Sequence, residues 1–165
     1  DKCKIIFAST HVIFEGYDDV MFDVDELKES KPILAYSKGK LISENDIISS
    51  NKNYVILRLG SNYGYSNDSM RMNIMPNIFA KIASQNGTIK MFSGGKQLKS
   101  LVSVFDTARC MKFMGESSAI NNDIFNCTNE KIAARIDAAA KYLRMFATNG
   151  GGALAAITIK LLGQA

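Results

Sequence analysis

Tyr36 and Lys40 are the residues of this sequence best suited to proton transfer, and they lie four positions apart in the segment AYSKGK. Residues at this spacing share one face of an α-helix. A phenol has an ordinary pKa of about 10 and is a weak acid–base catalyst at neutral pH, but a nearby ammonium group stabilises the phenolate. The pair could therefore move a proton to or from a hydroxyl or carbonyl oxygen. The alternative is an exposed tyrosine beside a solvated lysine.

Two hydroxyl groups, on Ser9 and Thr10, end the apolar run that begins at Lys4. Ligands of parallel α/β sheets bind beyond the carboxyl ends of the strands, so either hydroxyl could bond the oxygen that Tyr36 protonates. The alternative is that each hydroxyl bonds its own neighbouring backbone. The next residue, His11, is the only histidine and is more typical of a structural residue than of a catalytic one.

Strand-like and helix-like segments alternate along the chain and would position these residues. The patterns predict strands at Lys4–Ser9, Tyr54–Leu59, Thr88–Phe92, Leu101–Val104 and Asp123–Asn126, and helices at Ala35–Ser50, Ile74–Ser84, Thr107–Met114 and Ile132–Met145. Residues 15–34 and Gly60–Met72 are predicted loops, and Asp106 is the predicted N-cap of the helix that follows it. The alternation predicts an α/β fold with a parallel sheet and crossover helices.

The composition is that of an ordinary globular domain, with 165 residues, 47% hydrophobic and 22% charged. No apolar run approaches the length of about 20 residues that a membrane helix needs. The three cysteines show no CxxC spacing and their number is odd, so we expect a reducing, cytoplasmic location rather than a disulfide framework. With one histidine and no clustered ligands, no metal site is expected.

The net charge of +4 comes entirely from residues 131–165, which hold five basic residues and one acidic residue. These charges are spread singly, so we expect no nucleic-acid partner. The composition also changes here, from a core at 1–130 to a tail at 131–165 that is rich in Ala and Gly.

Four ordered blocks carry a resemblance that covers residues 4–130. They read STHVIFEG with PILAYSKGKLISEN, then VILRLGSNYG, MFSGGKQLKSLVSVFDTARC and DIFNCTNE. Together they resemble the extended short-chain dehydrogenase/reductases of the NAD-dependent epimerase/dehydratase family. The segment from Ser9 to Gly16 is most similar to the dTDP-4-dehydrorhamnose reductase and related epimerase branches. The dehydratase branch usually has Thr-Asp-Glu where this chain has Thr10-His11-Val12, which disfavours a 4,6-dehydratase.

The resemblance implies a Rossmann-like, doubly wound parallel sheet, here partial or rearranged, in an enzyme that uses NAD or NADP and acts on a nucleotide-linked sugar. Thr10, Tyr36 and Lys40 would be catalytic, and Ser9, Tyr36 and Lys40 would contact the cofactor. Ser61, Asn62 and Lys99 would contact the substrate. Ser61 stands where many relatives carry Asn, and Lys99 stands where many carry Arg. A homodimer would follow by analogy.

Gly39 also departs from the family pattern, which has Ser before the lysine. Glycine inside a helix costs about 1 kcal/mol relative to alanine, so close packing against a strand or the cofactor is one explanation. Together with the changes at Ser61 and Lys99, this departure leaves open a non-catalytic relative that serves as a binding or regulatory subunit, or an inactive fragment.

The glycine-rich first unit of the family is expected to be absent from this sequence. The tail offers a weak substitute, in which a strand at Leu143–Thr148, a turn at Asn149–Gly152 and a helix at Ala153–Leu162 have the order of a dinucleotide-binding turn. Two of the three family glycines are replaced. A linker followed by an unrelated Ala-rich helix is the interpretation that we favour, and an interaction role for the basic tail is a further alternative.

Overall fold

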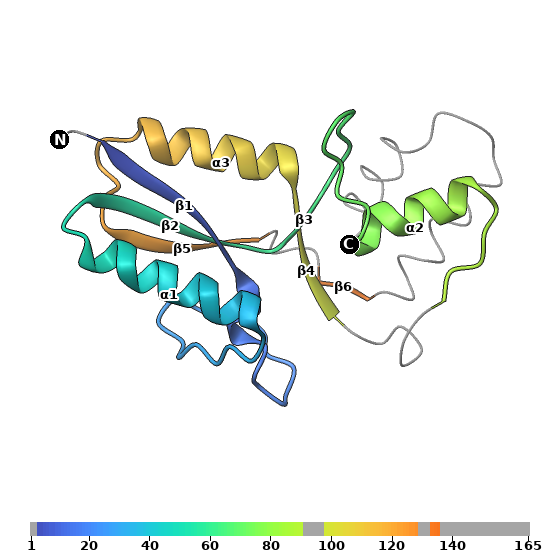
Figure 1. The fold of residues 1–165 in the computed structure, drawn as a ribbon, viewed down its shortest axis with the longest axis horizontal. Helices are drawn as coiled ribbons and strands as arrows, with labels where there is room; N and C mark the ends of the chain where they lie inside the picture. The colour runs from blue at the N-terminus through green and yellow to red at the C-terminus, as the bar shows by residue number, and fades with distance from the viewer. Residues whose placement is uncertain (1–2, 91–97, 129–132, 136–165) are drawn as a thin grey trace. The chain divides into compact units, whose positions relative to one another are not determined.

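Three parallel strands form the sheet that carries Ser9 and Thr10 (Figure 1). They are β1 (Lys4–Thr10), β2 (Asn53–Leu59) and β5 (Asp123–Cys127), in the order β1-β2-β5. Helix α1 (Ala35–Ser49) joins β1 to β2 and so provides the crossover that two parallel strands require. The computed structural model describes residues 3–90, 98–128 and 133–135.

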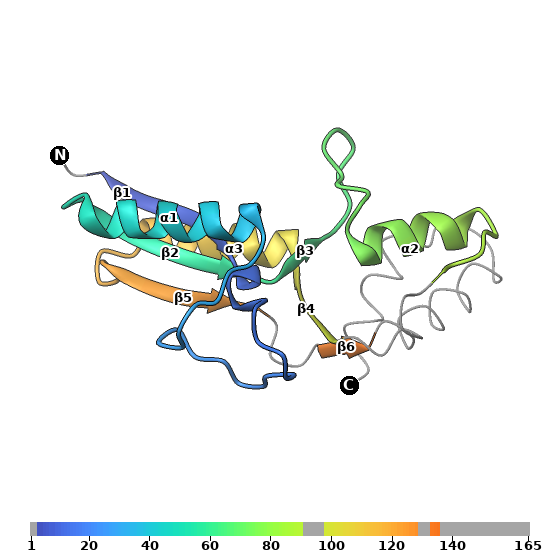
Figure 2. The ribbon, with the colours of Figure 1, turned by 60° about the horizontal axis from the view of Figure 1, so that its bottom comes forward.

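The two faces of this sheet are covered by different helices, as Figures 1 and 2 show. On one face, Val55, Leu57 and Leu59 form a buried cluster against which residues of α3 (Val104–Glu116) pack. On the other face, Phe7 contacts α1 through Lys40. Alternate residues of each strand point to opposite faces, so the apolar residues Val55, Ile56 and Leu57 of β2 serve both layers. This arrangement confirms the predicted Rossmann-like parallel α/β sheet.

The chain falls into two compact units. The first contains the residues up to Gly60 together with Asp106–Thr128, and therefore holds the three-stranded sheet. The second contains Ser61–Phe105 and the strand β6 (Ala133–Arg135).

In the second unit, β3 (Ser61–Tyr63) pairs in parallel with β4 (Leu98–Ser103), and β4 pairs antiparallel with β6. Helix α2 (Met75–Ser84) follows a loop. Tyr63 and Leu101 form a small buried cluster with residues just before and at the start of this helix.

The structure corrects several predicted elements. Ala133–Arg135 form a strand rather than the start of a helix, because their backbone pairs with β4 and this pairing overrides the helix propensity of alanine. The rest of that predicted helix lies outside the described residues, as does the predicted glycine turn of the tail. Thr88–Lys90 form no strand in the described chain, and the predicted loop at Gly60–Met72 contains β3.

The start of α3 also differs from the prediction. The helix begins at Val104, so Asp106 lies within its first turn and is not the N-cap. The hydroxyl of Ser103 accepts a hydrogen bond of 3.2 Å from the backbone N–H of Phe105 and takes the capping role. Asp106 instead forms an exposed ion pair with Arg109.

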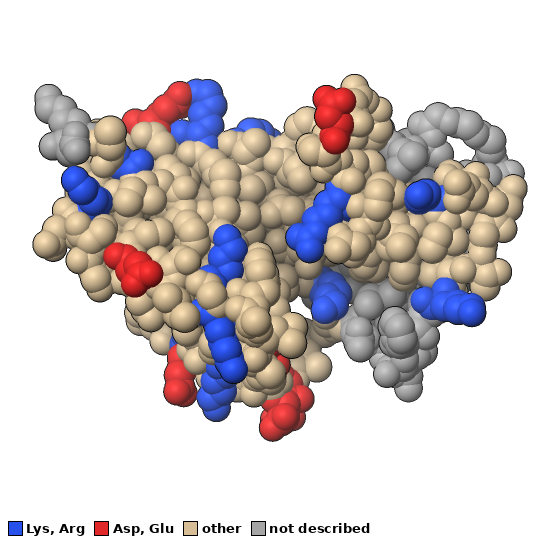
Figure 3. Space-filling model, in the orientation of Figure 1, with Lys and Arg blue, Asp and Glu red and all other residues tan. Residues whose placement is uncertain are grey.

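Surface charges of both signs are interspersed on the face drawn in Figure 3. The helices among the described residues lack the length and the apolar content that a membrane span needs. The cysteines Cys3, Cys110 and Cys127 are free thiols. Burial, together with the neighbouring Cys110 and Asp106, raises the pKa of Cys127 to about 12.

Candidate active site

Lys40 reaches from α1 to the neighbouring strand β1. Its ammonium group donates a hydrogen bond of 2.7 Å to the backbone carbonyl of Ala8 and lies 4.7 Å from the centre of the Phe7 ring. An ammonium has three N–H donors. The bond to Ala8 uses one of them, so Lys40 is fixed in place and can still donate to a bound molecule.

Tyr36 lies one helical turn before Lys40, in the first turn of α1. Its side chain is 55% exposed, and within the described residues its hydroxyl makes no hydrogen bond. The positive end of the helix dipole favours negative charge at this position. Tyr36 and Lys40 therefore have the shared helix that their spacing predicts, with the phenol open to an incoming group.

Glu15 caps the start of α1. Leu34, at the N-cap position, has no side chain able to accept a hydrogen bond. One carboxylate oxygen of Glu15 accepts hydrogen bonds from the backbone N–H of Ile33 (2.9 Å) and of Leu34 (2.7 Å), and from the hydroxyl of Ser37.

Desolvation alone would raise the pKa of Glu15. The hydrogen bonds from Leu34, Ser37 and Ile33 and the charge of Lys38 outweigh it and lower this pKa overall. The carboxylate is therefore stabilised in its charged form at the end of the helix where negative charge is favoured. Sequence reasoning assigned Glu15 no role, although the lack of a capping residue before Ala35 was a usable signal.

Backbone hydrogen bonds join the two ends of the loop before α1. The backbone N–H of Gly16 bonds the carbonyl of Lys31 at 2.9 Å, and the N–H of Lys31 bonds the carbonyl of Ile13 at 2.8 Å. A Cβ atom added to Gly16 would collide with the Lys31 carbonyl, so this close approach requires glycine. These bonds fix the position from which the chain enters the first turn of α1.

Thr10 and Ser9 are both buried at the carboxyl end of β1. The hydroxyl oxygen of Thr10 accepts a hydrogen bond of 3.2 Å from Val12 and caps the short 3-10 helix His11–Phe14. In this bond the Thr10 oxygen is the acceptor, so its hydroxyl proton can still be donated to another group. The hydroxyl of Ser9 donates to Glu44. These are local structural uses, and the catalytic and cofactor contacts of the two hydroxyls stay predictions. His11 has a ring nitrogen 2.9 Å from the carbonyl of Leu59, as expected of a structural residue.

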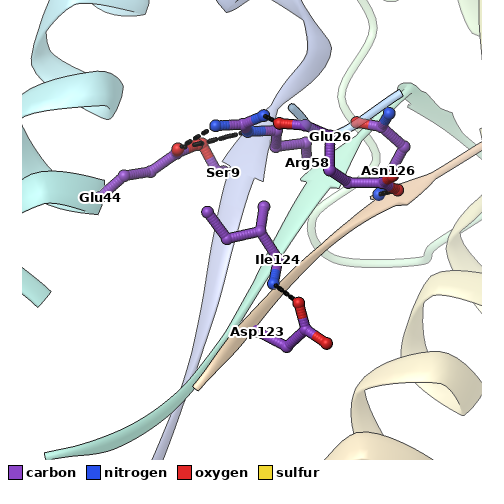
Figure 4. Close-up of polar contacts among 7 residues, drawn as sticks. All are labelled: Ser9, Glu26, Glu44, Arg58, Asp123, Ile124 and Asn126. Atoms are coloured by element: carbon purple, nitrogen blue, oxygen red, sulfur yellow. Dashed lines mark hydrogen bonds and ion pairs between the residues drawn. The ribbon is translucent and has the colours of Figure 1, made fainter. Parts of the chain in front are cut away.

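Glu44 and Arg58 form a buried ion pair that sequence reasoning did not find (Figure 4). Their side chains are 1% and 6% exposed, and the Arg58 Nη2 lies 2.8 Å from a carboxylate oxygen of Glu44. Two signals were available in the sequence. Arg58 interrupts an apolar run, and Glu44 is eight residues after Tyr36 on the same helix.

The predicted substrate residues Ser61, Asn62 and Lys99 belong to the second unit, whereas Tyr36 and the other predicted catalytic residues belong to the first. Ser61 and Asn62 lie on β3, and the exposed Lys99 lies on the adjacent β4. Their contacts with a substrate stay predictions.

Gly39 has open space around it. A Cβ atom added there meets nothing within 4 Å. The explanation that a strand packs closely on Gly39 is therefore wrong for the part of the chain that the structure describes.

Residues 1–128 match the sequence model of the NAD dependent epimerase/dehydratase family. The chain belongs to this family. Its match covers both elements that carry Tyr36, Lys40 and Thr10, and the predicted family resemblance is confirmed. A search of curated protein sequences finds no match.

Solved structures of similar fold include two UDP-glucose 4-epimerases. The enzyme of Thermotoga maritima, solved with UDP-glucose, has a TM-score of 0.76 and 22% identity over 90% of this chain and 48% of its own. The enzyme of Thermus thermophilus, solved with NAD, has a TM-score of 0.75 and 19% identity over 88% of this chain and 49% of its own.

A dTDP-glucose 4,6-dehydratase of Bacillus anthracis, solved with NAD, has a TM-score of 0.74 and 12% identity over 87% of this chain and 45% of its own. The present chain spans about half the length of each of these three solved structures. At these identities the likeness shows the shared fold.

The donors of α1 fit part of an NAD site. Lys40 has N–H groups beyond the one that bonds Ala8, and Tyr36, one turn before it on α1, is 55% exposed. These two residues could hold a ribose hydroxyl and the reacting oxygen of a substrate. A glycine-rich phosphate turn does not occur among the described residues, so the fit concerns one end of the cofactor.

Proposed function

We propose that the protein to which this chain belongs is an NAD-dependent epimerase or reductase acting on a nucleotide-linked sugar. The observation that carries the proposal is the placement of Tyr36 and Lys40 one turn apart on α1, with Lys40 bonded to β1 at Ala8. Membership of an NAD-dependent family supports the cofactor. The similar structures solved with UDP-glucose and with NAD support the substrate class.

In this proposal Tyr36 exchanges a proton with a sugar hydroxyl. As the phenolate it accepts the hydroxyl proton while the carbon–oxygen bond becomes a carbonyl, and as the phenol it returns that proton when the carbonyl is reduced. NAD, when bound, supplies the acceptor and donor of the hydride. Lys40 stabilises the phenolate and contacts the cofactor ribose, and the proton of Thr10 orients the sugar oxygen.

The positions of Thr10, Lys40 and Tyr36 support a single site at the carboxyl end of β1. Thr10 ends this strand, Ala8 anchors Lys40 on it, and Tyr36 follows from the loop that leaves it. Ligands of doubly wound sheets bind at the carboxyl ends of their strands. The substrate contacts of Ser61, Asn62 and Lys99 are part of the same proposal, as is a homodimer.

Turnover of the protein with NAD and a panel of UDP- and dTDP-hexoses tests this function, with sugar products separated by chromatography. Replacing Tyr36 by Phe should lower kcat by about 10²- to 10⁴-fold, because it removes the acid–base group. Binding of the nucleotide sugar, measured by calorimetry, should be retained. Tyr65→Phe is the matched control, since Tyr65 is 56% exposed and has no assigned role.

Full turnover in Tyr36→Phe would refute the catalytic assignment. Binding of the nucleotide sugar without turnover in the unmodified protein would favour the alternative of a non-catalytic binding subunit.

A further inference from the structure

A row of polar residues crosses the first sheet near its carboxyl end. Ser9 of β1 pairs in register with Arg58 of β2, and Arg58 pairs with Asn126 of β5. The preceding row on the same face is apolar and consists of Phe7, Ile56 and Ile124. Ser9 and Arg58 are 3% and 5% exposed. Buried polar groups require partners, so this row must be matched by groups that pack against the sheet.

Glu44 of α1 is the partner that joins two of these strands. Its carboxylate accepts a hydrogen bond from the hydroxyl of Ser9. From Arg58 it accepts bonds of 3.3 Å from Nε to each oxygen and one of 2.8 Å from Nη2 (Figure 4). A guanidinium that engages both carboxylate oxygens fixes the orientation as well as the distance. Glu44 therefore holds α1 against β1 and β2 together.

Arg58 is itself held from its other side. Its Nη1 donates a hydrogen bond of 2.9 Å to the carbonyl of Glu26, and its guanidinium lies 5.5 Å from the centre of the Phe14 ring. Asn126 ties down the same loop through the side chain of Glu26 and the carbonyl of Val24, both at 2.7 Å. Glu44 thus meets a partner whose position is already set.

Helix α1 depends on such contacts because its own packing is weakly apolar. Its buried side chains are Ser37 and Glu44. On the side that faces the sheet, Leu41 and Ile47 are half-buried and Ile48 is 42% exposed. Because no apolar side chain of α1 is fully buried, directional polar bonds help to set the position of α1 on the sheet beside these half-buried side chains.

The same polar bonds lie next to the candidate catalytic pair. Tyr36, Lys40 and Glu44 follow one another at intervals of four on α1, so they point to one side of the helix. Lys40 bonds the carbonyl of Ala8, and Glu44 bonds the next residue of β1, Ser9. A shift of α1 along β1 would break the Glu44 contacts and move the Lys40 ammonium away from Ala8.

We propose that Glu44 is a positioning residue, which acts through Ser9 and Arg58 to set where Lys40 and Tyr36 stand over the carboxyl end of β1. The importance of this role for catalysis rests on the function proposed above. The positioning itself is a property of the folded chain and can be measured without turnover.

Competitive labelling of lysines measures it directly. The folded 165-residue chain is treated with a trace of acetic anhydride, and the labelling of each lysine is read by mass spectrometry. Lys4 is an internal reference, because its ammonium donates to the carbonyls of Met114, Ser117 and Ile120 and does not contact α1. Unfolding exposes Lys4 and Lys40 together, whereas displacement of α1 exposes Lys40 alone.

Glu44→Gln should raise the labelling of Lys40 several-fold relative to that of Lys4. Ser9→Ala, which removes one bond to Glu44 and no charge, should give a smaller rise in the same direction and covers the case in which Glu44→Gln fails to fold. Glu116→Gln, at an exposed ion pair, should leave the ratio unchanged. In turnover assays, Glu44→Gln should lower kcat more than it changes KM.

An unchanged ratio in folded Glu44→Gln and Ser9→Ala, or a parallel rise of Lys4 and Lys40, would overturn the positioning role. Failure of the proposed function would appear differently, as unimpaired turnover in Tyr36→Phe, and would leave the labelling ratio as it is.

Discussion

The buried ion pair between Glu44 and Arg58 predicts a large and non-additive loss of stability when either charge is removed. Both side chains are almost entirely excluded from solvent. Removing one partner of such a pair leaves an uncompensated buried charge and typically costs about 3–5 kcal/mol. We therefore expect Glu44→Gln and Arg58→Met each to lower the free energy of unfolding by about 3 kcal/mol or more.

The double variant Glu44→Gln/Arg58→Met should lose much less than the sum of the two. It leaves no unpaired charge, and the main remaining cost is the carbonyl of Glu26, which loses the bond from Arg58. This carbonyl is only partly buried, so its loss is at most the value of about 1–3 kcal/mol for a fully buried group without its partner. The coupling energy of the cycle should therefore be several times the error of about 0.5 kcal/mol that independent sites show.

Urea unfolding followed by far-ultraviolet circular dichroism is the assay, since the chain has no tryptophan for fluorescence. With a slope of about 1–3 kcal/mol per molar urea, a loss of about 3 kcal/mol shifts the midpoint by about 1–3 M. Glu116→Gln is the matched control. Its pair with Lys112 is 67% and 69% exposed, and such surface pairs contribute about 0–1 kcal/mol.

Equal losses of stability in Glu44→Gln and Glu116→Gln would refute the reasoning, because the expected difference comes from the burial of the Glu44–Arg58 pair. Strict additivity of the two single variants would refute it as well, because it would mean that Glu44 and Arg58 do not stabilise each other.

Two further predictions concern the start of α1 and two glycines. Because the folded-state pKa of Glu15 is lowered, its stabilisation is present above its ordinary value of 4.5 and is lost as pH falls through the lowered value. Urea midpoints of Glu15→Gln should accordingly fall less below pH 4.5 than those of the unmodified chain, and parallel profiles would contradict this. Gly39→Ala should stabilise the chain by about 0.5–1 kcal/mol, since an added Cβ meets nothing. Gly64→Ala should destabilise it by about 1 kcal/mol or more, because Gly64 has φ +150 and Val104 is in the way. Thermal unfolding measures both effects, and melting temperatures that shift in the same direction in the two glycine variants would contradict these two predictions.

The local features of this chain could be predicted from its sequence. The spacing of Tyr36 and Lys40 required only a helix, and α1 covers both residues. The β-branched run of β2 predicted a buried strand, and Val55, Ile56 and Leu57 are fully buried. Alternation of such runs with helices was enough for the parallel α/β sheet, because two parallel strands need a crossover between them.

One error arose where a distant segment overrode the local pattern, and another where a neighbouring residue provided the helix cap. Ala133–Arg135 have helix-forming residues but pair with β4, some 35 positions earlier in the chain. Asp106 is a good capping residue, yet the helix begins before it at Val104, where Ser103 provides the cap.

The contacts that hold the candidate site were decided by the tertiary structure alone. Ser9 and Arg58 lie side by side because β1 and β2 pair in one particular register, and Glu44 reaches both because α1 packs on that face. Glu15 caps α1 from 18 and 19 residues away. The type of each residue determines which bonds it is able to make. Which partner it meets depends on strand register and helix packing, because these bring together residues that no sequence spacing relates.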